Sequence, residues 1–403
     1  MSSTTPLSKI LLMIIILAAV GQMTQTMYVP SMAMMADSFA VPPAWLQAVM
    51  ACYLIPYGLS QFIYGPLSDR FGRKPIILVG LAIYLVGTIV TLMAPSFSIF
   101  LLGSVIQGAG IGCGGAMART LTRDCFDGSR LHKANSLVSI GLIFSPLMAP
   151  VIGGLLSTYF GWQASYGFLF MLAAVVCLIM SLYFQETLPP EARRQDSVLK
   201  SYHHVMSNRQ FQGYLICLIA VFSGISVFEA AAGVLLGSTL GLSATTVSLL
   251  FVLPLPGFMA GSWLSSVIEQ RKSSGKSLLV GSVILLAGAL TVVIPGYFVT
   301  VTVETLIGGA FIYFMGAGVL FPAATTGAIS PFPRHAGTAG AVMGGVQNMS
   351  AGLFTLLAAQ MNVNDQFSLG AILLAMAVVS GLGLLLCRRQ NMAPDTPVTA
   401  LTD

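Results

Sequence analysis

One acidic side chain, Glu229, lies deep inside a long apolar stretch that runs from about residue 211 to residue 236. An ionisable group inside a membrane-spanning helix is costly, so it marks a functional site by default. A rise of 1.5 Å per residue from Phe211 puts Glu229 about 27 Å along such a helix, beyond its middle. Apolar surroundings favour the neutral carboxyl, so Glu229 is the candidate for proton exchange. A satisfied polar contact and a role in substrate binding alone are the alternatives.

Uncharged polar and aromatic side chains recur at helical spacing in two earlier stretches. One group is Tyr53, Tyr57 and Gln61, and the other is Gln22, Gln25, Thr26 and Tyr28. Polar groups facing lipid are unfavourable, so both groups should face inward, where they would bind flat apolar compounds without fixed charge. Hydrogen bonding between helices is the alternative. The candidates that would extend this substrate-binding wall, or else simply pack in the core, are Met117, Phe222, Phe228 and Phe251.

A short loop crowds one acid among three bases. Its residues of interest are Gly65, Asp69, Arg70, Gly72, Arg73 and Lys74. The glycines permit tight turns, and the bases alone would suit a loop at the membrane surface. The acid is the informative residue, because it suits a local salt bridge or a cap on a neighbouring helix.

A fourth group of small and proline residues lies between residues 141 and 154. Its members are Gly141, Pro146, Pro150, Gly153 and Gly154. Proline removes a backbone donor and kinks a helix, and glycine permits close packing, so this stretch is a candidate gate hinge. Ordinary membrane packing is the alternative.

The elements that must position these groups are membrane-spanning helices. Of 403 residues, 56% are hydrophobic and 8% charged, far from the composition of a soluble domain. Apolar runs long enough to cross a bilayer recur along the chain. They lie at 10–33, 45–66, 75–94, 98–118, 136–157, 164–184, 211–236, 246–267, 278–297, 303–324, 337–360 and 368–387. We predict an all-α membrane protein with twelve transmembrane helices, its first helix retained rather than cleaved as a signal peptide.

Charge placement predicts the orientation. With the amino terminus inside, all 18 lysine and arginine residues fall in cytoplasmic segments, and the external loops carry the acids Asp37, Glu304 and Asp365. Both termini are therefore expected in the cytoplasm. These bases are dispersed over the cytoplasmic segments, so the net charge of +5 does not indicate nucleic-acid binding.

A polar stretch divides the chain into two halves. We predict an N-terminal six-helix bundle at 1–185, a cytoplasmic linker at 186–210, a C-terminal six-helix bundle at 211–390 and a cytoplasmic tail at 391–403. A Gly-Ala-Gly triplet at 108–110 and another at 316–318 are weak evidence for an internal repeat. Repeated halves place a substrate site between them near the midplane.

The loop at 65–74 resembles the signature of the major facilitator superfamily and matches its defining positions. The stretches 27–32, 141–154 and 331–341 are similar to those of the drug–proton antiporter branch related to bicyclomycin exporters. The resemblance implies two pseudo-symmetric six-helix bundles and proton-coupled efflux of small hydrophobic or amphipathic drugs across the bacterial inner membrane by alternating access. Two departures remove intramembrane charge. Ser104 stands where the family has arginine, and Thr26 stands where relatives often have an acid.

Partners and alternatives follow from the same residues. The expected partners are small hydrophobic substrates, protons and the lipid bilayer, and we expect a monomer without cofactor or metal. The six cysteines form no CxxC pair, and His203 and His204 lie in a predicted cytoplasmic segment.

An exporter of one metabolite, such as a sugar or amino-acid derivative, is the alternative transporter. An enzyme would need paired acids or a nucleophile with its base, and the sequence places none at one depth.

Overall fold

The computed structural model describes residues 7–126, 128–189, 191, 198–271, 274–298, 301–332, 336–361 and 363–390, and all regular structure in these ranges is helical. The helices before the linker, here called the N-terminal helices, are α1 (Leu7–Thr26), η1 (Val29–Ser31), α2 (Met32–Phe39), η2 (Pro43–Leu46), α3 (Gln47–Phe71), α4 (Arg73–Leu92), α5 (Phe97–Cys125), α6 (Gly128–Phe160) and α7 (Gln163–Tyr183). A short helix, α8 (Val198–Met206), follows within the predicted linker. The C-terminal helices are α9 (Arg209–Val234), η4 (Leu235–Thr239), α10 (Ala244–Val252), α11 (Leu255–Arg271), α12 (Ser274–Phe298), α13 (Val303–Ile329), α14 (Ala336–Gln360) and α15 (Gln366–Gln390).

Eleven of the described helical stretches are long and apolar enough to cross a membrane, and Phe144–Phe160 of α6 is a shorter apolar helix. The run predicted at 246–267 is two helices, α10 and α11, because Pro254 between them cannot donate a backbone hydrogen bond. Some orientation residues lie outside the described part, namely Arg193, Arg194, Lys272 and Arg334, as does the predicted tail.

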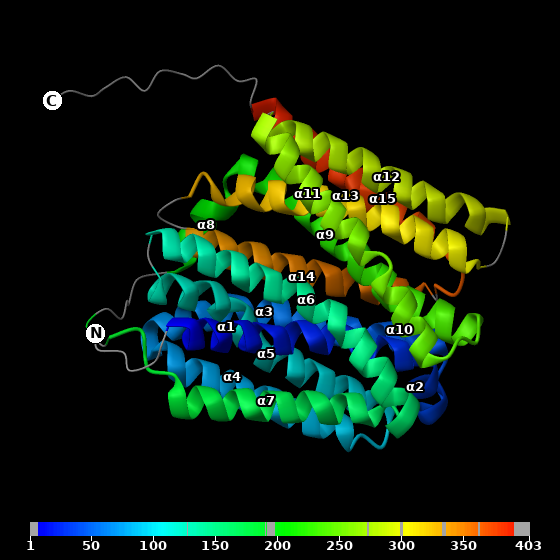
Figure 1. Cartoon of the computed structure of the whole chain (residues 1–403), viewed down its shortest axis with the longest axis horizontal. Helices are drawn as coiled ribbons and strands as arrows, with labels where there is room; N and C mark the ends of the chain where they lie inside the picture. The colour runs from blue at the N-terminus through cyan, green and yellow to red at the C-terminus, as the bar shows by residue number, and fades with distance from the viewer. Residues whose placement is uncertain are drawn as a thin grey trace.

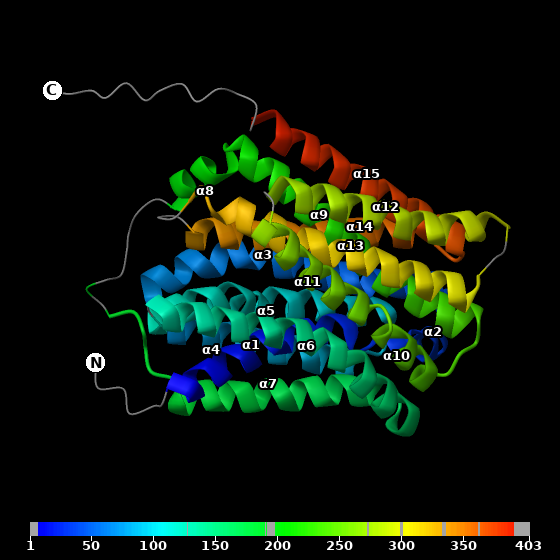
Figure 2. The ribbon, with the colours of Figure 1, turned by 45° about the horizontal axis from the view of Figure 1, so that its top comes forward.

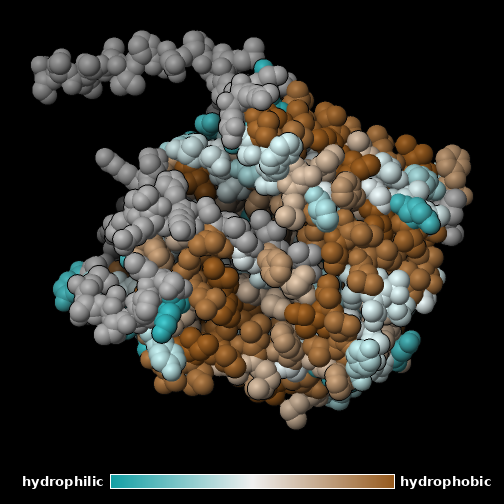
Figure 3. Space-filling view, in the orientation of Figure 1, coloured by the Kyte–Doolittle hydropathy of each residue, from teal (hydrophilic) through white to brown (hydrophobic). Residues whose placement is uncertain are grey.

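The surface of the helical assembly is apolar around its middle. Figure 3 shows hydrophobic side chains over most of the middle of one face, with hydrophilic ones towards its two ends. Large exposed side chains include Trp263 at 69% and Met259 at 61%, both on α11. An apolar belt of this kind fits a hydrocarbon environment, where the helices satisfy their own backbone hydrogen bonds.

The helices run side by side along the long axis, and their ends define two ends of the molecule (Figures 1 and 2). The described parts of the chain begin with α1 and finish with α15 at the end where α8 lies, while α2 and α10 lie at the other end. We call these the α8 end and the α10 end.

Two seams join the N-terminal to the C-terminal helices. In the first seam, α3 packs along α14; in the second, α6 contacts α10. At the first seam a Cβ on Gly58 would overlap the backbone of Gly345 and Met349. At the second, a Cβ on Gly154 would overlap the hydroxyl of Ser248. Glycine is needed at both positions because the backbones approach so closely.

Candidate functional site

Glu229 on α9 faces Gln25 on α1, so it lies where the N-terminal and C-terminal helices meet. The Nε2 of Gln25 donates to Oε2 of Glu229 at 3.3 Å and lies 3.5 Å from Oγ of Ser226, one turn earlier on α9. Gln25 is 5% exposed and Glu229 is partly exposed. The glutamate predicted as a proton carrier and a glutamine predicted to bind substrate therefore form one interhelical contact.

An amide suits a carboxyl group that changes its protonation state. Its NH₂ group donates to a carboxylate, and its carbonyl oxygen accepts from a protonated carboxyl. A lysine or arginine in its place would stabilise only the charged form. The Gln25–Glu229 pair can therefore persist through protonation, while its geometry depends on the distance between α1 and α9.

The remaining predicted substrate-binding residues are distributed over several places. Tyr28 is 2% exposed, and its hydroxyl has no hydrogen-bond partner in the described structure. The ring of Phe228 packs against those of Phe251 and Phe314, at centroid distances of 6.1 and 5.7 Å, within the C-terminal helices. Met117 is fully buried, whereas Gln22 and Phe222 are partly exposed.

The tyrosine face of α3 packs among the N-terminal helices. Tyr53 and Tyr57 stack with ring centroids 5.7 Å apart, and the Tyr53 hydroxyl donates to the Gly21 carbonyl of α1 at 2.7 Å. Tyr53, Tyr57 and Gln61 are each 3% exposed. In this conformation Tyr53 makes the interhelical hydrogen bond that was the alternative to cavity lining.

Thr26 contacts the proline stretch of α6. Pro150 has no N–H, so the carbonyl of Pro146, four residues earlier, lacks its helical donor. The Thr26 hydroxyl lies 3.4 Å from this oxygen and donates to it. Nearby, a Cβ on Gly153 would overlap the Met27 carbonyl. The proline stretch of α6 thus packs against the C-terminal end of α1, at the residues that directly follow Gln25.

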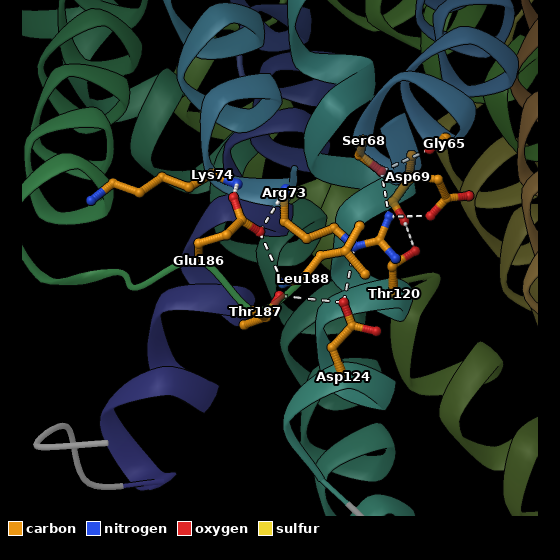
Figure 4. Close-up of polar contacts among 11 residues, drawn as sticks. Gly65, Ser68, Asp69, Arg73, Lys74, Thr120, Asp124, Glu186, Thr187 and Leu188 are labelled. Carbon is orange, nitrogen blue, oxygen red and sulfur yellow. Dashed lines mark hydrogen bonds and ion pairs between the residues drawn. The ribbon is translucent and has the colours of Figure 1, made fainter. Parts of the chain in front are cut away.

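A second cluster lies at the α8 end, around Arg73 (Figure 4). The guanidinium is paired with Asp69 and lies 2.9 Å from Oδ2 of Asp124 on α5. It also donates to the Ser68 hydroxyl at 2.6 Å. Arg73 is 6% exposed, so its fork of donors is satisfied by groups from α3 and α5.

Glu186, which follows α7 in the chain, caps the N-terminus of helix α4. Its two carboxylate oxygens accept from the backbone N–H groups of Arg73 and Lys74, at 2.8 and 3.1 Å. These N–H groups begin α4 and have no partner within the helix, and a negative charge is favourable there. Gly72 makes the preceding turn with φ of 104°, a conformation that favours glycine.

Sequence reasoning missed Asp124 and Glu186 in this cluster. It proposed a salt bridge or a helix cap for Asp69; Asp69 makes the salt bridge, and Glu186 makes the cap. Composition could have pointed to both residues, because Asp124 is an acid in an otherwise basic segment and Glu186 is an acid at the start of the linker. Arg70 points elsewhere, over the ring of Phe71 at 5.3 Å.

The apolar helices of the described chain define a polytopic membrane protein. Comparison with known proteins shows a transporter rather than an enzyme and specifies its family. The sequence profile of the Major Facilitator Superfamily matches residues 14–355. The chain belongs to the major facilitator superfamily.

Relatives and a solved structure agree with this assignment. The chain is 46% identical over 381 residues to multidrug resistance protein D of Escherichia coli, covering 94% of each chain. It is 26% identical to multidrug resistance protein MdtL of Escherichia coli, covering 93% of each. The human organic anion transporter MFSD10 shares the fold, with a TM-score of 0.65 and 16% identity over 95% of this chain and all of that chain.

Proposed function

We propose that this protein exports small hydrophobic or amphipathic compounds, including drugs, across the bacterial inner membrane in exchange for protons. The observation that carries the proposal is its 46% identity, over 94% of both chains, to a protein named for multidrug resistance. A narrow substrate range would instead favour the alternative function, export of a single metabolite by the same fold.

The proposed topology has twelve spans with both termini in the cytoplasm, α6 supplying the twelfth beside the eleven candidate spans. We assign 1–185 and 211–390 to two bundles that rock about the substrate site, with 186–210 as the linker. The α8 end is then cytoplasmic and the α10 end external. In support, the basic residues Arg70, Arg73 and Arg209 lie at helix ends on the α8 side, as the positive-inside rule requires, and the acids Asp37 and Glu304 belong to the other end.

Glu229 is the proposed proton carrier of this exchange. It is acidic, lies within a candidate span and contacts α1 through Gln25. In the proposed cycle, separation of α1 from α9 removes the amide from the carboxyl and exposes Glu229 to one side of the membrane. Substrate binds among the aromatic side chains of α1, α3 and α9 from the cytoplasm once Glu229 has lost its proton there, and protonation of Glu229 from the outside is coupled to substrate release.

Glu229→Gln tests this assignment directly. The variant cannot ionise but keeps a hydrogen-bonding group of similar size, so drug-driven proton flux in inverted vesicles should be lost. Drug binding to the purified protein should be retained. Asp37→Asn is the matched control, because Asp37 is exposed on α2. Undiminished proton flux in Glu229→Gln would refute the role of Glu229.

Substrate range is measured separately. Cells that express the protein should tolerate several chemically unrelated lipophilic compounds better than cells without it, and dissipating the proton gradient should abolish the difference. Protection against one compound only would favour the metabolite exporter.

A further inference from the structure

Helix α8, in the middle of the predicted linker, is docked on both sets of helices. Its Val205 side chain is fully buried, and the ring of His204 lies edge-on to that of Phe332, with centroids 5.9 Å apart. The helix also contacts α14 and α9. Figures 1 and 2 place it beside the ends of these helices. The linker therefore includes a packed element rather than only an extended tether.

Tyr202 of α8 donates to a backbone carbonyl that α3 itself cannot satisfy. Pro66 lacks an N–H, so the carbonyl of Phe62, four residues earlier, loses its helical donor. The Tyr202 hydroxyl donates to this oxygen at 3.2 Å. The two rings also meet edge-on, with centroids 5.9 Å apart and an interplanar angle of 87°. An unbonded carbonyl in α3 thus becomes the attachment point for the linker.

Phe62 is also part of the seam between α3 and α14. A Cβ on Gly345 of α14 would lie 2.5 Å from Cε2 of Phe62, so this ring lies directly on the α14 backbone. Burial, together with the negative charge of Asp69, raises the pKa of Tyr202 to about 12. The hydroxyl therefore remains a donor throughout the physiological pH range.

We propose that α8 is a latch in which Tyr202 positions α3 against α14, so that docking of the linker favours the conformation with this seam closed at the α8 end. The latch itself stands on these contacts, and its effect on transport rests on the alternating-access function proposed above. Opening the seam at this end would separate Phe62 from Gly345, and α8 cannot then keep its contacts with both α3 and α14.

Three variants, compared with the wild type, test the latch through Pro66, which frees the Phe62 carbonyl: Tyr202→Phe, Pro66→Ala and the double variant. Hydrogen–deuterium exchange of the α8 amides in detergent measures docking without any substrate. Loss of one hydrogen bond should raise their exchange roughly fivefold in Tyr202→Phe. In the Pro66→Ala background residue 66 supplies the missing N–H, so Tyr202→Phe should have little further effect. Equal increases in both backgrounds, or no increase in either, would overturn the latch.

Two further measurements keep the proposal falsifiable if Pro66→Ala folds poorly. His203→Ala is the matched control on α8, because His203 is exposed. It should leave exchange unchanged, and an increase equal to that of Tyr202→Phe would refute a specific role for the hydroxyl. The distance between spin labels at Phe71 on α3 and Thr338 on α14 then measures the opening of the seam. Tyr202→Phe should increase the population with the longer distance. An unchanged distance distribution would refute the positioning of α3, whatever the protein exports.

Discussion

Arg73 shows how much a single side chain can organise at the α8 end. It lies at the first position of α4 and pairs with acids from α3 and α5. Its fork donates in several directions at once, to Asp69, Asp124 and Ser68, which a lysine ammonium on a flexible stem does less well. Since Arg73 is nearly fully buried, any partner that it loses there is not replaced freely by water.

Arg73→Lys should therefore destabilise the protein although the charge is kept. We expect a loss of about 2 kcal/mol, because charge-assisted hydrogen bonds to Asp124 and Ser68 are lost or lengthened. The thermal unfolding midpoint in detergent measures this. Arg70→Lys, at an exposed neighbouring position, should change the midpoint little. Equal midpoints for the two variants would contradict the role assigned to the Arg73 cluster.

At the scale of helices, the seam between α3 and α14 depends on the absence of side chains. A Cβ at Gly58 would overlap backbone atoms of α14, and backbone atoms cannot move aside as the end of a flexible side chain can. The same seam is closed further along by Gln47 of α3, which donates to the Val363 carbonyl beyond α14 at 3.1 Å. Small residues let helices pack closely where lipid offers no hydrophobic driving force.

Gly58→Leu should force this seam apart. We expect transport to fall at least tenfold, because overpacking costs about 1–3 kcal/mol and the closed seam is required in one half of the proposed cycle. Transport of a fluorescent substrate into inverted vesicles is the measurement. Gly167→Leu on α7 is a matched control, because a Cβ at Gly167 meets nothing within 4 Å. A Gly58→Leu variant as active as this control would show that the seam need not close.

At the scale of the whole molecule, the proposed orientation in the membrane rests on the unequal placement of charge. Lysine and arginine gather on the predicted cytoplasmic side because they are transferred across the bilayer less readily than acids. The Arg73 cluster and α8 lie at the same end of the molecule, so one labelling experiment locates both relative to the membrane.

In a variant without the six native cysteines, Asp37→Cys should react with an impermeant maleimide in intact cells. His203→Cys should react only after the membrane is permeabilised. Both positions are exposed, so a failure to react reports the side of the membrane and not burial. Reaction of His203→Cys in intact cells would reverse the proposed orientation.

The apolar runs, the charge pattern and the isolated glutamate could all be found from the sequence alone. Membrane-spanning helices follow from local composition, because the cost of placing each residue in lipid is nearly independent of its distant neighbours. Sequence reasoning therefore found Glu229, the loop around Arg73 and the proline stretch of α6. It did not predict the break between α10 and α11, although Pro254 was a signal for that break.

The partners of these residues were decided only by tertiary structure. Gln25 and Glu229 are separated by 204 residues, and Arg73 and Glu186 by 113. Helical periodicity gives the face on which a side chain lies but not the helix that this face meets. Packing of the helices brings Gln25 to Glu229. It also brings Thr26 and Tyr202 each to a backbone carbonyl that a proline leaves without its helical donor. A hydrogen bond depends on two atoms lying about 3 Å apart, and only the folded chain sets that distance.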